Sequence, residues 1–595
     1  MQPFQEKFKK LSISNFVELS LIAPIRYENY IVQNTILPNT SMVIDATVEN
    51  IQRTPKTLQI KLFAHNLGFH IQAVFFKPKN YLLHQFELYS RLYLYGSIDC
   101  KSGICSIHHP KKISPTLIGE VTPIYKTAIR SDIFRKFLKE NLTLENLKKE
   151  ALKDEIIQNI FDIHFPKTPK SKLDDKDIYT LKYLEIFNYL KQLANKRKYF
   201  PSMTNQVNDI TSWIDTLPFR LTKEQLKAIE DIKNDMLKDV SAKRMIVGDV
   251  GSGKTMVILA SALMNYPNKS ILMAPTTILA KQLYEEALKF LPSLHVKLVT
   301  NKTKKEDLEN YDFIIGTHAL LYRELPSASL VMVDEQHRFG TKQRNLLSKL
   351  VESQDKKPHF LQFSATPIPR TQAMIESSHI DVSLITSTPF KKDITTKVIT
   401  KKDFKDLLLH VKNEINQNHQ VLIIYPLVEE SEAINYQSID EARSYWEKNF
   451  ENVYVTHGKD KEKEQILEEF RDKGDILIAT TVVEVGISLP RLSTVIIVGA
   501  ERLGLSTLHQ LRGRVSRTGL KGWCFLYTNQ EKPKRLEEFC NTTNGFDIAN
   551  MDLRYRQSGD LLKGDTQSGK SFKYFNLATD EKIIKEVKTD LAVFT

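Results

Sequence analysis

The pattern of apolar and polar positions changes twice along the chain. Between residues 41 and 118, short apolar stretches such as SMVIDATV, FHIQAVFF and RLYLYGSI are separated by turns that contain Gly, Asn, Pro or Lys. This spacing predicts a small antiparallel sheet or barrel. Residues 131–200 show helical periodicity instead, and YLEIFNYLKQLANKRKYF predicts a helix with a basic end.

From about residue 210 onward, short apolar strands alternate with helical stretches. RMIV, SILMA, FIIG, SLVMVD and HFLQFSAT form one series, and VLIIYPL, VYVTHG, ILIATT, VIIVG and WCFLY form a second one after Pro389. Two consecutive series of this kind predict two parallel sheets covered by helices, which bind ligands at the carboxyl ends of their strands. The last 60 residues leave the pattern, and DLRYRQSGDLLKGDTQSGK has the composition of a polar linker.

The positive charge of the chain is concentrated in its first third. The net charge is +13, and residues 1–200 contain 30 Lys and Arg against 19 Asp and Glu. A solvated basic face would give the same count, but so sharp an asymmetry favours a polyanionic partner, nucleic acid rather than a membrane. No apolar run reaches the length of about 18 residues that predicts a membrane span, and the N-terminus lacks the pattern of a signal peptide. The four cysteines form no CxxC pair, so we expect reduced thiols in a cytoplasmic protein.

The strongest chemical motif is GDVGSGKT, which follows the strand RMIV and opens the helix TMVILASALM. This context predicts a P-loop, in which backbone N–H groups and the helix N-terminus contact phosphate oxygens. Lys254 is expected to contact the β- and γ-phosphates and Thr255 to ligate Mg²⁺. We therefore predict that ATP is held by Gly248, Asp249, Val250, Gly251, Ser252, Gly253, Lys254 and Thr255.

Two further motifs supply candidate catalytic groups. The strand in VMVDEQHRFG delivers Asp334 and Glu335, which we assign as a Mg²⁺ ligand and as the general base that orients water. In HQLRGRVSR, Arg514 and Arg517 are three residues apart, on one face of a helix. Arginines at this density are usually solvated or bind phosphate. Supplied across a cleft they would act as arginine fingers, which accelerate related NTPases by roughly 10³–10⁵.

Together these motifs resemble those of superfamily 2 helicases. FRLTKEQ resembles the adenine-sensing Q motif, with Gln225 reading the base and Phe219 beside it, and APTTILAKQ, GTHAL, SATPIPR, TTVVEVGISLP and HQLRGRVSR resemble motifs Ia, Ib, III, V and VI. Two families have closely similar motif sequences, the RecG helicases and the transcription-repair coupling factors. The motifs that resemble theirs are GDVGSGKT, DEQHRFG, SATPIPRT and QLRGRVSR. APIRYENY, AVFFKPKNYL and HHPK resemble the RecG wedge domain, and no counterpart of the polymerase-binding domain of the coupling factors is found. The sequence is therefore similar to the RecG family, in a short form without an N-terminal extension.

The resemblance implies an α/β fold with two tandem RecA-like P-loop domains, an N-terminal OB-fold β-barrel wedge domain and a small C-terminal helical hairpin, the translocation motif. The expected segments are an N-terminal helical segment (1–40), the wedge (41–120), a helical linker (121–208), the ATP-binding helicase domain 1 (209–390), helicase domain 2 (391–535), and the translocation motif with the C-terminal tail (536–595).

The resemblance also implies DNA contacts. Thr276, Thr277 and His318 are expected near the DNA backbone. In the wedge, Phe76 and Tyr81 are expected to stack on bases, whereas Phe75 points to the other face of its strand.

Motif V adds a nucleotide contact through Gly486, and Arg556 and Gln567 are retained residues of the translocation motif. The sequence departs from the family pattern at Ser488 and Ser516 in the helicase motifs, and at 557–558 and 565–566 in the translocation motif. We expect the helicase-motif departures to change nucleotide affinity without abolishing hydrolysis.

The function implied by the resemblance is that of an ATP- and Mg²⁺-dependent 3′-to-5′ DNA helicase. It would unwind branched DNA in recombination and repair, through reversal of stalled forks, branch migration of Holliday junctions and removal of D-loops and R-loops. The implied setting is a monomer in the bacterial cytoplasm, associated with the nucleoid and with a single-strand DNA-binding protein. Two alternatives remain open at this stage, an RNA-remodelling DExH-type helicase and a branched-DNA-binding scaffold with an inactive ATPase.

Overall fold

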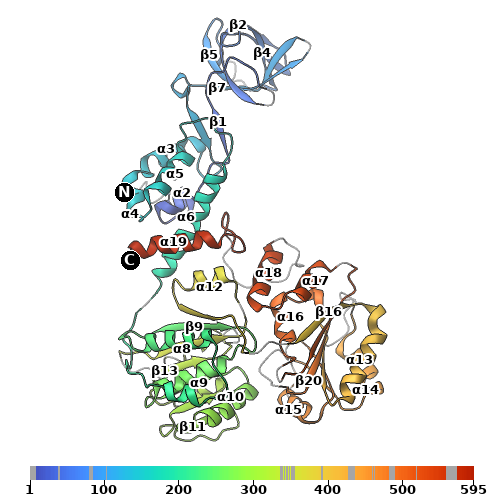
Figure 1. The fold of residues 1–595 in the computed structure, drawn as a ribbon. Coiled ribbons are helices and arrows are strands. Elements are labelled where there is room, and N and C mark those ends of the chain that lie inside the picture. Colours follow the sequence, from blue (N-terminus) through green and yellow to red (C-terminus); the bar gives the residue numbers. More distant parts are fainter. Residues whose placement is uncertain are drawn as a thin grey trace. The chain divides into compact units, whose positions relative to one another are not determined.

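The computed structural model describes residues 8–594 apart from 38–39, 79–84, 102, 198, 336–338, 341, 344–345, 348, 350–354, 367, 390–392, 427–435, 459, 461, 481–488, 517–518, 532 and 558–571. The chain divides into two compact units (Figure 1). Unit 1 comprises Met1–Gln192, Lys570–Asn576 and Lys582–Thr595, and unit 2 comprises Leu193–Gly569 and Leu577–Glu581. In the described part of the chain, no helix is both long enough and apolar enough to cross a membrane.

Unit 1 contains a closed barrel of five strands. Its strands are β2 (Ser41–Arg53), β3 (Thr57–Ala64), β4 (Phe69–Phe76), β6 (Ile104–His108) and β5 (Arg91–Lys101), which pairs back onto β2, and the short β7 (Lys111–Ile113) extends the sheet from β5. The pairs are antiparallel except for β4 and β6. Alternate side chains of β3 are buried, as a barrel wall requires. This confirms the predicted OB-fold barrel.

The cysteines of the barrel correct one prediction. Cys100 on β5 lies directly opposite Cys105 on β6, with 4.0 Å between their Cα atoms, and the two are joined by a disulfide bond. The expectation of reduced thiols is therefore wrong for this pair, whereas Cys524 and Cys540 are free. The absence of a CxxC motif did not exclude this bond, because the register of the hairpin brings the two side chains together.

The rest of unit 1 is mainly helical. It contains α2 (Phe16–Ser20), the antiparallel pair β1 (Arg26–Asn29) and β8 (Val121–Ile124), η2 (Pro115–Leu117), α3 (Ser131–Asn141), α4 (Leu144–Lys149), α5 (Asp154–His164), α6 (Asp175–Ala194) and α19 (Glu581–Phe594). The end of the chain returns to this unit. The Tyr183 hydroxyl donates to Asp590, 2.7 Å away, and the Glu185 carboxylate accepts from the backbone N–H groups of residues 573–575.

Helicase domain 1, in unit 2, is built on seven parallel strands in the order β11-β12-β10-β13-β14-β9-β15. Its elements are α7 (Thr211–Thr216), α8 (Lys223–Met236), β9 (Lys243–Gly248), α9 (Lys254–Asn265), β10 (Ser270–Met273), α10 (Thr277–Phe290), β11 (Val296–Val299), β12 (Phe313–Gly316), η3 (His318–Tyr322), β13 (Leu330–Val333), β14 (His359–Ser364), α12 (Arg370–Glu376) and β15 (Asp381–Ile385). The strands are buried on both faces, which explains why they appear as continuous apolar runs.

Helicase domain 2 is a second parallel sheet, in the order β16-β21-β20-β17-β19-β18. Its elements are β16 (Ile394–Ile399), η5 (Lys401–Asp403), α13 (Phe404–Asn416), β17 (Gln420–Ile424), α14 (Ile439–Asn449), β18 (Val453–Thr456), α15 (Lys463–Lys473), β19 (Ile476–Ala479), β20 (Leu492–Val498), η7 (Ala500–Arg502), α16 (Leu505–Arg512) and β21 (Gly522–Tyr527). Two helices follow the sheet, α17 (Lys534–Asn541) and α18 (Gly545–Gln557). The two predicted parallel sheets are confirmed.

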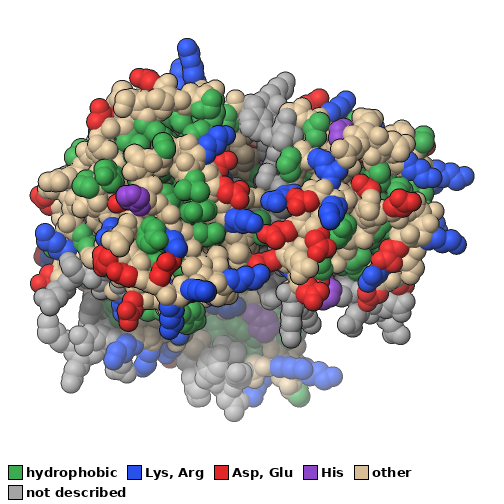
Figure 2. All heavy atoms as spheres, turned by 90° about the horizontal axis from the view of Figure 1, so that it is seen from below, with side chains coloured by type: hydrophobic (Ala, Val, Ile, Leu, Met, Phe, Trp, Pro, Cys, Tyr) green, Lys and Arg blue, Asp and Glu red, His purple; other side chains and the backbone are tan. Residues whose placement is uncertain are grey.

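The surface in Figure 2 shows basic and acidic side chains interspersed over the face in view. This agrees with the near balance of charge in residues 201–595, where 54 Lys and Arg stand against 52 Asp and Glu. A place in unit 2 where Lys and Arg side chains outnumber Asp and Glu therefore differs from the rest of this surface.

Candidate nucleotide-binding site

The P-loop connects the last residue of β9, Gly248, to the first residue of α9, Lys254. Gly251 and Gly253 have left-handed backbone angles, φ 79° and 77°, which glycine adopts without the cost that a Cβ would bring. A Cβ on Gly253 would also collide with the Gln225 side chain. The glycines therefore shape a tight turn at the start of a helix, the arrangement that a phosphate cradle requires.

Polar side chains of the loop are placed for phosphate. Lys254 Nζ donates to the carbonyl oxygens of Gly248 and Asp249, at 2.9 and 3.1 Å, and is thereby held over the loop. The Ser252 hydroxyl is buried and has no hydrogen-bond partner within the described residues. Thr255 follows as the second residue of α9 and is half-buried. An orphaned hydroxyl beside a lysine fits a site that receives phosphate oxygens.

Asp334 directly follows the carboxyl end of β13, which lies in the same parallel sheet as β9, the strand that leads into the P-loop. Burial and the neighbouring Glu335 carboxylate raise the pKa of Asp334 to about 7, and the charge of Lys254 acts in the opposite direction. A divalent cation at this point would favour the ionised carboxylate, so Asp334 and Thr255 fit a Mg²⁺ site. When bound, the ion would neutralise charge on the phosphate oxygens.

Glu335 is held in a conformation that few residues adopt. Its φ is 49°, in the left-handed region, and its backbone N–H donates to Asp334 Oδ1 at 3.0 Å. Its carboxylate accepts from the backbone N–H of Ala365, 3.2 Å away, in the SATP motif. Strained backbone of this kind concentrates at functional sites, and the role of Glu335 as the water-orienting base stays a prediction.

The Q motif is attached to the P-loop. Gln225 closes a capping box with Thr222 at the start of α8, and its Nε2 donates to the carbonyl oxygen of Ser252 at 2.8 Å. Phe219 is exposed on one side and packs edge-on against Phe290. The structure thus places Gln225 against the phosphate loop, while its contact with adenine stays a prediction.

Motif VI comes from helicase domain 2 and meets the P-loop. His509 Nε2 lies 2.6 Å from Asp249 Oδ1, and a Cβ on Gly513 would come within 3.0 Å of Val250. A cavity of about 250 Å³ lies among these residues. Arg514 follows directly and is half-buried, but α16 ends at Arg512, so the expectation that Arg514 lies on the face of a helix is wrong. Arg517 and Gly486 lie outside the described residues.

Similarity to known proteins identifies the family. The DEAD/DEAH box helicase family matches residues 222–375, and the helicase conserved C-terminal domain matches residues 401–519. The chain is 44% identical to the ATP-dependent DNA helicase RecG of Helicobacter pylori strain J99, over 99% of this chain and 98% of the relative. A RecG of Streptococcus pneumoniae is 33% identical over 98% of this chain and 92% of the relative. The chain belongs to the RecG family.

A solved structure supports the same assignment. The structure of RecG bound to a three-way DNA junction matches with a TM-score of 0.57 and 27% identity, over 98% of this chain and 84% of that chain. As a RecG-family protein, the chain is an ATP-dependent DNA helicase and hydrolyses ATP. Family membership decides against the RNA-remodelling and inactive-scaffold alternatives.

The predicted DNA contacts of this RecG-family helicase lie on two units. In unit 2, Thr276 caps α10, Thr277 is its first residue, and the exposed His318 begins η3. These residues follow the neighbouring strands β10 and β12, at the same sheet edge as Asp334.

In unit 1, alternation along β4 buries Phe75, which is 3% exposed, and leaves Phe76 51% exposed. The Phe76 ring stacks against His108, with 5.7 Å between the centroids. Tyr81 lies outside the described residues. The exposed ring of Phe76 is therefore available for the predicted stacking on a base.

Helix α18 carries the start of the predicted translocation motif. Asp552 is buried, and its carboxylate accepts from the backbone N–H of Leu505 at 3.0 Å, at the N-terminus of α16. The N–H of Gly545, the first residue of α18, donates to Asp249 Oδ2 at 3.1 Å. Arg556 belongs to α18, but its side chain and Gln567 lie outside the described residues.

Sequence reasoning did not predict the contacts made by His509 and Gly545. Both residues lie in segments that the motifs mark, yet no spacing along the chain places positions 249, 509 and 545 together. Only the packing of α16 and α18 against the P-loop reveals this arrangement.

Proposed function

We propose that this RecG-family protein uses Mg²⁺-ATP to move along branched DNA in the 3′-to-5′ direction and to unwind it. Its substrates would be stalled forks, Holliday junctions, D-loops and R-loops, in recombination and repair. The main support for this proposal is that the carboxylate of Asp249 makes hydrogen bonds both to His509 of motif VI and to the first residue of α18. The phosphate loop is thus in direct contact with the segment proposed to move DNA.

The catalytic roles follow from chemistry at the P-loop. Lys254 would bind phosphate oxygens, Asp334 and Thr255 would hold Mg²⁺, and Glu335 would orient the attacking water. Arg514, with Arg517, would stabilise charge on the transferred phosphoryl group from helicase domain 2. Because these arginines come from the other domain, hydrolysis would depend on closure of the two domains.

The wedge would separate strands at the junction. The exposed ring of Phe76 and the side chain of Tyr81 are proposed to stack on the bases of the opened strands, which is worth roughly 1–3 kcal/mol per base. Thr276, Thr277 and His318 would contact phosphates without reading sequence, because a translocating enzyme must accept every base.

The cellular setting is part of the proposal. A monomer with the six predicted segments would act at the bacterial nucleoid, together with a single-strand DNA-binding protein. Relatives named RecG in Helicobacter pylori and Streptococcus pneumoniae support a bacterial setting.

The test is a panel of substrates at equal nucleotide concentration: a fork, a four-way junction, a linear duplex and single-stranded RNA. We expect ATP hydrolysis to be stimulated most by the fork and the four-way junction, and only these two to be unwound efficiently. Omission of Mg²⁺ should abolish both activities. Stronger stimulation by RNA than by the fork would overturn the proposal.

A further inference from the structure

A pocket of about 460 Å³ lies at the sheet edge of helicase domain 1 that is opposite to the nucleotide site. Lys243 begins β9, Phe360 is the second residue of β14, and Asp381 begins β15. The strands are parallel and adjacent, and Phe360 pairs with Lys243 in register, so these residues meet at one edge. The P-loop follows the other end of β9, six residues away at roughly 3.3 Å per residue.

The lining of the pocket is basic. It contains five Lys and Arg side chains against two Asp: Lys196, Arg197, Lys238, Lys243, Lys357, Asp235 and Asp381. Both aspartates are ion-paired, Asp381 with Arg197 at 2.6 Å and Asp235 with Lys238 at 2.9 Å. Asp235 has a second cationic partner in Arg244, also at 2.6 Å. The acidic groups are thus neutralised within the wall, and the pocket keeps a positive charge.

The positive charge of the pocket affects the pKa of His379, which is one of the lining residues. Burial lowers its pKa, Glu376 opposes the shift, and the charges of Lys243, Lys196 and Arg197 lower the pKa further. Three cations from two separate segments of the chain thus act on one imidazole ring. The Nδ1 atom of His379 is buried and has no hydrogen-bond partner among the residues that the structure describes.

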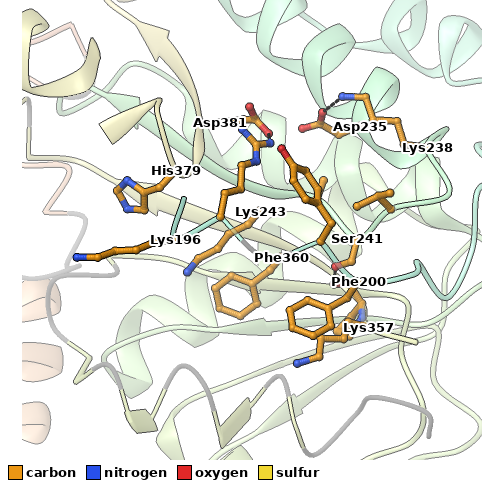
Figure 3. A pocket seen from close by; sticks show the side chains of 15 residues that line it. Lys196, Phe200, Asp235, Lys238, Ser241, Lys243, Lys357, Phe360, His379 and Asp381 are labelled. Atoms are coloured by element: carbon orange, nitrogen blue, oxygen red, sulfur yellow. Dashed lines mark hydrogen bonds and ion pairs between the residues drawn. The ribbon is translucent and has the colours of Figure 1, made fainter. Parts of the chain in front are cut away.

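Aromatic rings lie between the cations. Tyr199 is 67% exposed and Phe200 is 37% exposed. The Arg197 guanidinium lies 5.4 Å from the centroid of the Tyr199 ring, and Lys357 Nζ lies 3.9 Å from that of Phe200. Figure 3 shows the rings of Phe200 and Phe360 facing the pocket between Lys243 and Lys357.

The aromatic segment is anchored to the sheet. The backbone N–H of Ser241 donates to the Phe200 carbonyl at 2.8 Å, and that of Lys357 donates to the Pro201 carbonyl at 2.9 Å. Bridges of β type join residues 201 and 202 to residues 240 and 357. The backbone next to the two rings is therefore fixed before any ligand arrives, which lowers the entropic cost of binding.

We propose that this pocket binds a segment of single-stranded DNA, with bases on Tyr199 and Phe200 and phosphates on Lys196, Lys243 and Lys357. Exposed rings interleaved with lysines are the combination by which proteins hold single strands without reading their sequence. A purely acidic peptide would use the lysines but has no flat group to stack on the exposed aromatic rings. The volume lies within the usual range for a bound ligand, roughly 300–1,000 Å³.

The inference rests on the proposed function, because unwinding is what supplies a separated strand. It concerns a different surface from the motor contacts, since Thr276, Thr277 and His318 follow the carboxyl ends of their strands and the pocket lies where strands begin. A strand held here stays away from the nucleotide site, so its binding should not depend on ATP.

Lysine footprinting tests the site on the full chain. The protein is acetylated with and without an unlabelled dT 12-mer, and in a parallel arm with poly-glutamate, and the modified lysines are quantified by mass spectrometry. We expect the oligonucleotide to reduce acetylation of Lys196, Lys243 and Lys357 at least about threefold, and the Tyr199→Ala variant to lose this protection. Lys405 and Lys412, exposed on α13, serve as internal controls that should not change.

Binding of the same oligonucleotide tests the lysines. Lys196→Glu/Lys243→Glu should weaken binding and make it less dependent on salt, by about 0.7 in the slope of log K against log salt for each phosphate that the lysines no longer neutralise. Lys405→Glu/Lys412→Glu is the matched control. Basal ATP hydrolysis should be unchanged in both double variants and in Tyr199→Ala, which shows that the domain is folded.

Two results would overturn the inference. Protection by poly-glutamate without protection by dT would identify an acidic protein segment as the ligand, and absence of protection in both arms would show that the pocket binds neither. Fork unwinding by the unmodified chain is measured in parallel. If the fork is unwound but the pocket lysines stay reactive, only the pocket assignment fails; if the fork is not unwound, the proposed function fails.

Discussion

The carboxylate of Asp249 in the P-loop faces Nε2 of His509 in motif VI at a distance of 2.6 Å, and both side chains are buried. The other oxygen of Asp249 accepts from the N–H of Gly545, at the start of α18. His509 is held in turn by Arg512, whose guanidinium lies 3.1 Å from His509 Nδ1. A movement of the loop would therefore act directly on α16 and α18 through these two hydrogen bonds.

Removal of this link should uncouple ATP hydrolysis from DNA movement. In His509→Ala the P-loop keeps its glycines and Lys254, so we expect hydrolysis to persist at a reduced rate. The number of base pairs unwound for each ATP hydrolysed should fall about tenfold, because α16 no longer contacts Asp249 through this bond. The measurement is parallel ATPase and fork-unwinding kinetics. An unchanged ratio would contradict the coupling role, and His419→Ala, which removes a half-buried histidine elsewhere in helicase domain 2, is the control.

Asp552 should stabilise helicase domain 2. Gly504 precedes α16 and offers no side chain as a cap, so the Asp552 carboxylate takes over this role from another helix. Asp552→Ala should lower the free energy of unfolding by about 1–2 kcal/mol, and Asp552→Asn by less, since its amide oxygen still accepts. Urea denaturation followed by tryptophan fluorescence provides the measurement, because Trp446 and Trp523 lie in this domain. A loss no greater than that of the exposed Asp547→Ala would refute the capping role.

The translocation motif makes a separate prediction. Arg556→Ala and Gln567→Ala should keep most DNA-dependent ATP hydrolysis, because neither position belongs to the P-loop or to motif VI. Unwinding of a four-way junction should fall at least about tenfold. If both variants unwind the junction normally, the segment that the sequence marks as polar and glycine-rich is a passive tail.

His164 should make unit 1 sensitive to acid. Burial lowers the pKa of His164 to about 4, and the neutral ring donates from Nε2 to the Ser20 carbonyl while Nδ1 meets the Tyr125 hydroxyl. Because the ordinary pKa is 6.5, the unfolded chain takes up a proton first as the pH falls, and stability is lost from pH 6.5 down to about 4.

We expect a loss of about 2 kcal/mol between pH 7 and pH 5. All three tryptophans, Trp213, Trp446 and Trp523, lie in unit 2, so hydrogen exchange of peptides from unit 1 is the appropriate readout. In His164→Gln this part of the pH dependence should disappear. If the variant is as sensitive to acid as the parent, the buried histidine is not its cause; the exposed His108→Gln should behave like the parent.

Local patterns in the sequence were sufficient for the barrel, the two parallel sheets and the phosphate loop. The P-loop could be predicted because glycine spacing, a preceding strand and a following helix are all encoded within a few residues. Phe75 and Phe76 could be assigned to opposite faces because a strand alternates its faces, and the structure shows that Phe75 is the core residue.

Contacts between distant segments were not accessible in this way. The disulfide between Cys100 and Cys105 depends on hairpin register, and the bonds of Asp249 to His509 and Gly545 depend on how two sheets and a helix pack. The basic pocket could not be predicted from the sequence for the same reason, since Lys196, Lys243 and Lys357 come from three separate segments. Each of these features is a property of the tertiary structure.

If ATP bound at the P-loop drives the unwinding of branched DNA, the Lys254→Ala variant should lose this activity. Single-turnover unwinding of a fluorescently labelled fork is measured with saturating ATP and Mg²⁺, for the parent chain and for the variant. We predict that the variant still binds the fork but unwinds it at least about a hundredfold more slowly, because the phosphate oxygens lose their cationic partner. Unwinding by Lys254→Ala at the rate of the parent chain would contradict an ATP-driven motor at the P-loop.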